Sequence, residues 1–108
     1  MSFNIILVDS FEKELKALAK KYPSIRTDVA GLGEQLLNDP TMGTPIGSDC
    51  YKIRMTITSK GRGKSGGARV ITHVLVKNNN IYLLSIYDKS EAESISDSDI
   101  LQRLKNLQ

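Results

Sequence analysis

The residues best suited to chemistry in this chain are cations gathered in residues 50–87, a stretch that contains no Asp or Glu. Its seven members are Lys52, Arg54, Lys60, Arg62, Lys64, Arg69 and Lys77. The rest of the chain holds the other eight Lys and Arg and all twelve acidic residues, so the net charge of +3 conceals a polarised molecule. A cationic, strand-like surface is typical of proteins that hold a polyanion, and RNA or DNA is the first candidate.

The centre of this stretch is a glycine-rich loop, residues 60–67, with the sequence KGRGKSGG. Its last part is similar to the end of a phosphate-binding loop, but that motif requires glycine where the chain has Thr58, and a helix where the chain continues as a strand. Nucleotide hydrolysis is therefore disfavoured. Glycines do let backbone amides approach a phosphate closely, and a merely soluble hairpin loop is the alternative. We expect RNA contacts from Lys60, Arg62, Ser65, Gly66 and Gly67.

Metal, cofactor and thiol chemistry find little support in the sequence. The single cysteine, Cys50, and the single histidine, His73, lie in no Cys/His motif and cannot form a zinc site without several carboxylates. We interpret Cys50 as a small, partly buried residue at the start of a strand, and we predict no metal and no cofactor. One cysteine excludes an internal disulfide framework and is typical of a reducing cytoplasm. No membrane span or secretory signal is recognisable.

Hydropathy patterns predict the elements that must position the cations. Strands are expected over residues 3–8, 51–57, 69–77 and 81–87. Helices are expected from capping oxygens at Asp9-Ser10 to Tyr22, from a cap at Ser24 to about Leu37, and after a cap at Ser96. Residues 41–49 are predicted to be a loop. This β-α-α-β-β-β-α order predicts one α+β domain over residues 1–108, with a small antiparallel sheet, a helical hairpin and a C-terminal helix.

Alternation along the strand at residues 51–57 places Lys52 and Arg54 between apolar residues, so both cations are predicted to lie on its open face. The glycine-rich loop joins this strand to the next one, which carries Arg69. We therefore expect the two strands and the loop to bring their cations to one face of the sheet.

Three segments carry a resemblance to a known family: YKIR at residues 51–54, GRGKSGGARVI at residues 61–71 and YLLSIYDK at residues 82–89. They resemble the RelE/ParE superfamily of bacterial toxins, and most closely its HigB-like, RelE-type branch. The resemblance extends over nearly the whole chain and implies the RelE-like microbial RNase fold. It also implies a cytoplasmic toxin with an antitoxin partner, acting as a metal-free endoribonuclease that cuts mRNA on the ribosome and so inhibits translation.

By this resemblance the family's basic strand residues fall on Lys52 and Arg54, and its strand arginine falls on Arg69. Its cation near the end of the last strand falls on Lys89, with Tyr87 close by. Nucleases of this type often carry a catalytic tyrosine near the C-terminus, but residues 90–108 contain no tyrosine. Either Tyr87 takes part, or the chemistry depends on Lys and Arg alone, or the nuclease is weak, and the sequence leaves these alternatives open.

Metal-free RNA cleavage requires a base at the 2′-hydroxyl, charge stabilisation at the phosphorane and an acid at the 5′-oxygen. A lysine crowded by other cations loses its proton more readily, so Lys52 or Lys64 is the candidate base. Arg54 and Arg69 would stabilise the phosphorane, because a guanidinium matches two phosphate oxygens. Two groups near the end of the last predicted strand are the candidate acids, Tyr87 and Lys89.

Two other functions remain open on the sequence alone. A ParE-like gyrase poison would act by binding a protein and would not need the sheet cations. A non-catalytic RNA-binding domain would hold RNA mainly through its phosphates, since stacking platforms need exposed aromatics and this chain has only four Tyr, two Phe and no Trp.

Overall fold

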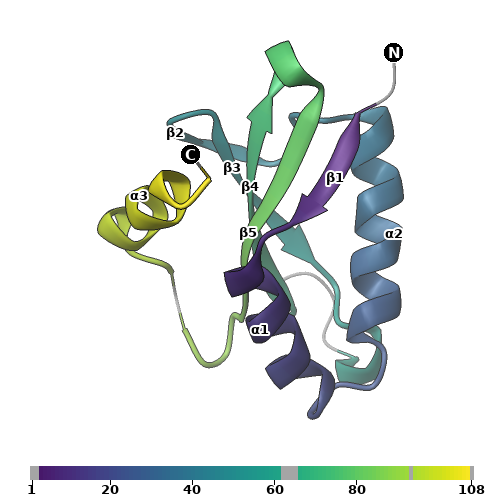
Figure 1. Cartoon of the computed structure of the whole chain (residues 1–108). Coiled ribbons are helices and arrows are strands. Elements are labelled where there is room, and N and C mark those ends of the chain that lie inside the picture. Colours follow the sequence, from purple (N-terminus) through teal and green to yellow (C-terminus); the bar gives the residue numbers. More distant parts are fainter. Residues whose placement is uncertain (1–2, 62–65, 93, 108) are drawn as a thin grey trace.

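The computed structural model describes residues 3–61, 66–92 and 94–107. Along the chain it contains, in order, β1 (Asn4–Leu7), α1 (Asp9–Ala19), α2 (Ile25–Asn38), β2 (Thr44–Gly47), β3 (Cys50–Met55), the 3₁₀ turn η1 (Thr58–Lys60), β4 (Ala68–Leu75), the 3₁₀ turn η2 (Val76–Asn78), β5 (Asn80–Asp88) and α3 (Asp97–Lys105). The helical hairpin and the C-terminal helix lie beside a central sheet (Figure 1), so the predicted α+β class is confirmed.

The sheet has the strand order β1-β5-β4-β3-β2. The pairs β3–β4 and β4–β5 are antiparallel, as predicted, and so is the pair β2–β3. By contrast, β1 pairs with β5 in parallel, from Asn4 opposite Asn80 to Leu7 opposite Leu83. The sheet is therefore mixed rather than wholly antiparallel. A parallel partner requires a long crossover connection, and the helical hairpin with the strands that follow it supplies one.

The segment at residues 41–49, predicted to be a loop, contains the short edge strand β2. Two residues, Ser48 and Asp49, turn the chain from β2 into β3 with φ of 55° and 57°, the left-handed backbone of the tight primed hairpin turns. Pro45 lies within β2, and an edge strand tolerates proline because one side of it makes no ladder hydrogen bonds. The Gly and Pro content that indicated a loop is equally compatible with such an edge strand.

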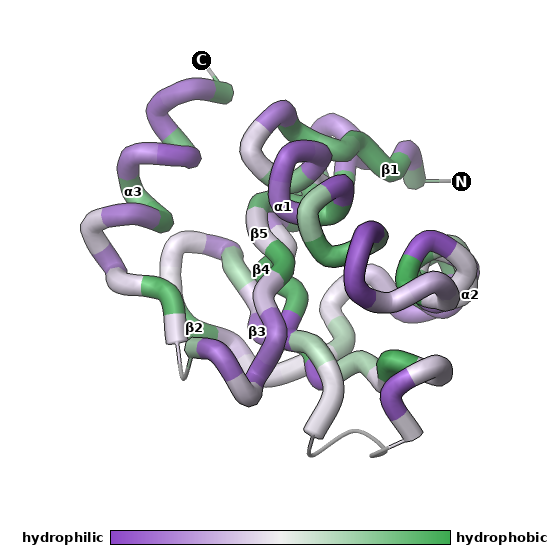
Figure 2. The backbone as a smooth tube through the Cα atoms, turned by 90° about the horizontal axis from the view of Figure 1, so that it is seen from below, coloured by the Kyte–Doolittle hydropathy of each residue, from purple (hydrophilic) through white to green (hydrophobic). Residues whose placement is uncertain are grey.

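The core lies mainly between the sheet and the helical hairpin. Figure 2 shows α1 and α2 on one side of the strands and α3 on the other. The larger buried cluster joins Phe11, Leu15, Ile25, Val29 and Leu36 of the hairpin to Ile53, Val70, Ile81 and Ile86 of the sheet. A smaller cluster on the opposite face is formed by Cys50, Ile71, Leu84 and Ile100, so α3 covers only part of that face.

The helix starts differ in part from the predicted caps. The extended residue before α1 is Val8, so Asp9 and Ser10 are already helical, and the Ser10 hydroxyl donates to the Leu84 carbonyl at 3.1 Å. The Ser96 cap of α3 is confirmed, since its hydroxyl oxygen accepts the Asp99 N–H at 3.1 Å.

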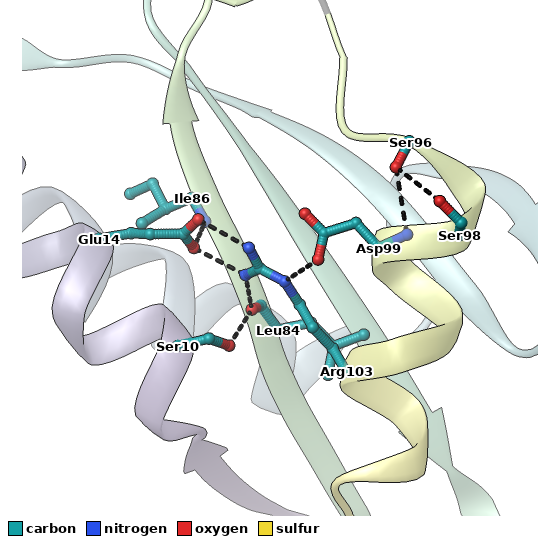
Figure 3. Close-up of polar contacts among 8 residues, drawn as sticks. All are labelled: Ser10, Glu14, Leu84, Ile86, Ser96, Ser98, Asp99 and Arg103. Atoms are coloured by element: carbon teal, nitrogen blue, oxygen red, sulfur yellow. Dashed lines mark hydrogen bonds and ion pairs between the residues drawn. The ribbon is translucent and has the colours of Figure 1, made fainter.

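A β-bulge in β5 provides the attachment point of α3. Ile71 pairs with Ser85 whereas Thr72 pairs with Leu83, so Leu84 is an extra residue in the ladder. Its carbonyl accepts a hydrogen bond from Arg103 Nη1 at 2.7 Å, in addition to the one from Ser10. In Figure 3 the Arg103 side chain extends from α3 across to β5 and α1.

The remaining donors of Arg103 bind two carboxylates. Nη1 and Nη2 each lie 2.9 Å from an oxygen of Glu14, and Nε lies 3.0 Å from Asp99. Glu14 also accepts the Ile86 N–H at 3.3 Å (Figure 3), which satisfies β5 beyond the end of β1. The hydrogen bonds to Glu14 raise the pKa of Arg103 above its usual value despite its partial burial. A bidentate ion pair thus joins α3 to α1, and the hydrogen bond from Arg103 to the Leu84 carbonyl joins α3 to β5.

Candidate nucleic-acid interface

Three of the predicted site residues form a row across β3, β4 and β5, near one end of these inner strands. Arg54 of β3 lies directly opposite Arg69 of β4, and Arg69 lies directly opposite Tyr87 of β5. Residues that oppose each other on neighbouring strands project on the same face, with strands only about 5 Å apart. Lys52, two residues from Arg54 on β3, shares this face. The predicted convergence of strand cations is therefore present, and we call these four residues the cationic row.

The members of the cationic row differ in how far they reach into solvent. Arg54 is exposed and Lys52 is half-buried, whereas Arg69 is only 5% exposed. Arg69 donates from Nη1 to the carbonyl of its neighbour Ala68 at 3.1 Å, which holds the guanidinium close to the sheet. A fixed guanidinium beside an exposed one suits a phosphate, which can accept hydrogen bonds from both.

Tyr87 ends the row with a hydroxyl that is buried and has no hydrogen-bond partner among the described residues. Burial raises the pKa of Tyr87, and the nearby charge of Arg69 only partly opposes this. The hydroxyl consequently keeps its proton at neutral pH. A protonated hydroxyl beside the Arg69 guanidinium, with no partner among the described residues, can donate a hydrogen bond or a proton to an oxyanion.

The glycine-rich loop is described only at its ends. The predicted residues Arg62, Lys64 and Ser65 lie outside the described residues. Gly67 is buried, and a Cβ there would lie 2.2 Å from the Met55 carbonyl oxygen, so only glycine fits between β3 and β4. Gly66, beside it, is half-buried. The Gly67 carbonyl accepts the backbone N–H of Lys89 at 3.0 Å, which places Lys89 beside the end of the loop.

Lys60, expected to contact RNA, is instead engaged inside the protein. Its ammonium lies 2.7 Å from Asp88 Oδ1 and 3.0 Å from the Ser90 hydroxyl, and its side chain is only 12% exposed. It also lies 5.5 Å from the ring centre of Tyr22. An ammonium held by a buried carboxylate is not available to a phosphate, so this geometry is at odds with the expected role of Lys60 and we leave it out of the proposed RNA contacts.

Sequence reasoning missed Asp88, which lies on the side of the sheet facing α1. Its side chain is fully buried and accepts hydrogen bonds from Lys60, from the Tyr22 hydroxyl at 2.5 Å and from the Ser90 backbone and hydroxyl. Burial alone would raise the pKa of Asp88, but these hydrogen bonds outweigh it and hold the pKa well below its usual value. The available signal was its position, the first acid after the acid-free stretch.

A second carboxylate holds the other side of η1. Asp28 of α2 accepts the Thr58 N–H at 2.9 Å and the Thr58 hydroxyl at 2.6 Å. Ser24, expected to cap α2, donates to Asp28 at 2.8 Å and accepts the Ser59 N–H at 2.8 Å. The first stem of the glycine-rich loop is thus bound on one side by α2 and on the other by the end of β5.

Cys50 and His73 oppose each other on β3 and β4, with Sγ 3.6 Å from Nδ1. Cys50 is only 1% exposed, and burial raises its pKa to about 11. It therefore remains a thiol at neutral pH. Cys50 is the first residue of β3, as predicted, but it is fully rather than partly buried. Within the described residues, no three His, Cys, Asp or Glu side chains gather closely enough to hold a metal ion. No helix in the described parts of the chain is long and apolar enough to span a membrane.

The fold resembles solved structures of a bacterial toxin. A double-mutant E. coli RelE toxin in the free state superposes with a TM-score of 0.67 at 18% identity, over 100% of both chains. A chain of the intact E. coli RelBE toxin–antitoxin complex matches with a TM-score of 0.60 at 19% identity, over 82% of this chain and 96% of that one.

The mutant RelE toxin in complex with an antitoxin RelBc peptide matches with a TM-score of 0.62 at 17% identity, over 96% of this chain and 95% of that one. No model of a known protein family matches the sequence. At these identities the likeness establishes the fold, and the chain has the α+β fold of the E. coli RelE toxin.

Proposed function

We propose that this protein is the toxin of a type II toxin–antitoxin system and that it acts as a metal-independent endoribonuclease on mRNA. The observation that carries the proposal is the cationic row, in which Arg54, Arg69 and Tyr87 oppose one another on three neighbouring strands. The likeness to the RelE toxin fold supports the toxin class. The row adds the chemistry, because it combines phosphate-binding guanidinium groups with a protonated hydroxyl.

In the proposed reaction the 2′-oxygen attacks the adjacent phosphorus as its proton leaves to a base, and the 5′-oxygen departs with a proton from an acid. Arg69 and Arg54 stabilise the charge on the pentavalent phosphorane. Tyr87 is our preferred acid because its hydroxyl keeps its proton, with Lys89 as the alternative. Lys52 is our preferred base because it shares the face of the row, and Lys64 remains the alternative.

We further propose that the ribosome orients the messenger on this site. The row lacks a pair of histidines, the groups best tuned for acid–base work at neutral pH. Orientation of the substrate by a larger assembly compensates for weak acid–base groups, because correct alignment alone contributes a large rate factor. An antitoxin is the proposed inhibitory partner, supported by the RelBE complex among the similar structures.

The test is inducible expression in a bacterium, followed by primer extension on a chosen messenger. We expect cuts in phase with codons, lost in Arg69→Ala and strongly reduced in Arg69→Lys, which keeps the charge but not the guanidinium fork. Lys77→Ala is the control, since Lys77 belongs to the same acid-free stretch but lies exposed in η2, away from the row.

Addition of a chelator selective for transition metals, which leaves the Mg²⁺ of the ribosome in place, should leave the cuts of the purified protein with ribosomes unchanged. Growth arrest with intact messengers would contradict the nuclease proposal and favour the gyrase-poisoning alternative, whereas RNA binding without cuts would favour the non-catalytic one.

A further inference from the structure

A groove of ≈ 270 Å³ lies between α2 and the end of β3. Its floor is apolar and its rim is polar and cationic: Leu32, Met42 and Met55 line the floor, and Thr27, Gln35 and Arg54 line the rim. Ligand pockets for larger molecules typically start near ~300 Å³, so this groove suits a small flat group. Among the described residues that line the groove, Asp28 is the only one with a carboxylate, and that carboxylate already accepts hydrogen bonds from Thr58 and Ser24.

Gly31 of α2 lines this groove and is not required by the packing of the fold. A Cβ at Gly31 would meet no atom of the described residues within 4 Å, and its backbone is ordinary right-handed helix. Glycine is, after proline, the least favourable residue in a helix interior. A helical glycine that neither packing nor backbone geometry requires, at the wall of a groove, keeps that groove open for something other than the chain itself.

The groove is continuous with the cationic row through Arg54, which belongs to both. Within the described residues, β2 pairs with β3 only from Cys50 to Lys52, so the outer edge of β3 is open from Arg54 onward. Backbone donors and acceptors on an open strand edge are available to a ligand. A polynucleotide whose phosphate lies at Arg54 can therefore place a neighbouring base around this edge.

We propose that this groove is a nucleobase subsite, which takes one unstacked base of the RNA strand bound at the cationic row. The proposal rests on the function proposed above. Single-stranded RNA is recognised through unstacked bases whose faces contact apolar or planar groups and whose edges form hydrogen bonds. Here the floor receives the base face, and the Thr27 hydroxyl, the Gln35 amide and the open edge of β3 are the groups that read its edge.

The experiment measures binding of a short 2′-O-methyl RNA, which cannot be cleaved, and moves a single abasic site through its sequence. For the wild-type protein we expect one position at which loss of the base weakens binding about tenfold. Gly31→Leu fills the groove, so it should weaken binding of the intact strand by a similar factor and abolish the penalty for the abasic site. Its thermal midpoint should equal or exceed that of the wild type, since leucine is a better helix former.

Ala30→Leu is the matched control, because Ala30 is exposed on the same helix but lines a different groove, beside β1. It should bind as the wild type does and keep the abasic penalty. An abasic penalty that is the same in Gly31→Leu and in the wild type would overturn the subsite while leaving the proposed nuclease intact. A wild-type protein that binds no RNA at all would overturn the proposed function together with the subsite.

Discussion

Asp88 binds the ammonium of Lys60 and so removes this cation from those available to a polyanion. Side chains alternate along β5, so Tyr87 joins the cationic row on one face while Asp88 faces the helices on the other. On that face Asp88 engages Lys60, whereas the residue opposite Arg69 in the register is Tyr87. The end of one strand thus serves stability on one face and the candidate site on the other.

Asp88→Asn is expected to destabilise the protein at neutral pH by about 2–4 kcal/mol, because it leaves the nearly buried ammonium of Lys60 without its counter-charge. The pKa of Asp88 is lowered in the folded protein, so its stabilising effect is present above the unfolded value of about 4 and is lost as pH falls through the folded pKa. The measurement is urea unfolding of both proteins at pH 7 and below pH 4.

The difference in free energy of unfolding between wild type and Asp88→Asn should narrow in acid. Burial raises the pKa of Asp28, but hydrogen bonds from Thr58 and Ser24 outweigh this, so its pKa is lowered overall. Asp28 is present in both proteins, so its contribution to the pH dependence cancels in the comparison. Asp39→Asn is the control, since Asp39 is exposed and should show little effect at either pH. A pH-independent difference for Asp88→Asn would show that packing, rather than charge, explains its effect.

The polar attachment of α3 depends on Arg103, in addition to the apolar packing of Ile100. Arg103→Met should lower the free energy of unfolding by about 1–3 kcal/mol, because it removes the paired hydrogen bonds to Glu14 and leaves the bulge carbonyl of Leu84 with one donor fewer. Amide hydrogen exchange should accelerate along α3 more than in the strands. Lys105→Met, an exposed change on the same helix, should leave both measurements unchanged. Equal exchange in the two variants would contradict an anchoring role for Arg103.

Much of this element order could be predicted because each long element has a local pattern. The alternation on β3 and the 3.6-residue period of α1 and α2 are visible in short windows of sequence. The parallel pairing of β1 was not, because its partner β5 lies some 76 residues away and nothing local in Asn4–Leu7 selects it. Nothing local reveals the partner of Arg103 either, because Glu14 lies 89 residues away in the chain.

The candidate site was predictable in part for a similar reason. Alternation placed Lys52 and Arg54 on one face, but only the strand register shows that Arg54, Arg69 and Tyr87 oppose one another. The engagement of Lys60 by Asp88 depends on side chains 28 residues apart. Composition reports how many cations a surface holds, whereas the fold determines which of them are already paired.

For the molecule as a whole, segregation of charge predicts a salt-dependent affinity for single-stranded RNA. Three phosphate contacts, from Lys52, Arg54 and Arg69, should give a slope of about −2 in a plot of log affinity against log salt concentration. Arg54→Ala should reduce the magnitude of that slope by about 0.7, and Lys77→Ala should leave it unchanged. Fluorescence anisotropy with a non-cleavable RNA at several salt concentrations makes this measurement. A wild-type slope near zero would exclude the row as a phosphate-binding surface.

The parallel pairing of β1 with β5 also constrains the order in which the protein can fold during its synthesis. β1 is made first but can join the sheet only after β5, the last strand, has been synthesised. Contacts this distant in sequence form slowly, because a long stretch of chain must be ordered first. The cationic row likewise needs β5 to supply Tyr87. A nascent chain that has not reached β5 therefore carries the cations of β3 and β4 without an assembled row, and the row can form only once β5 has been synthesised.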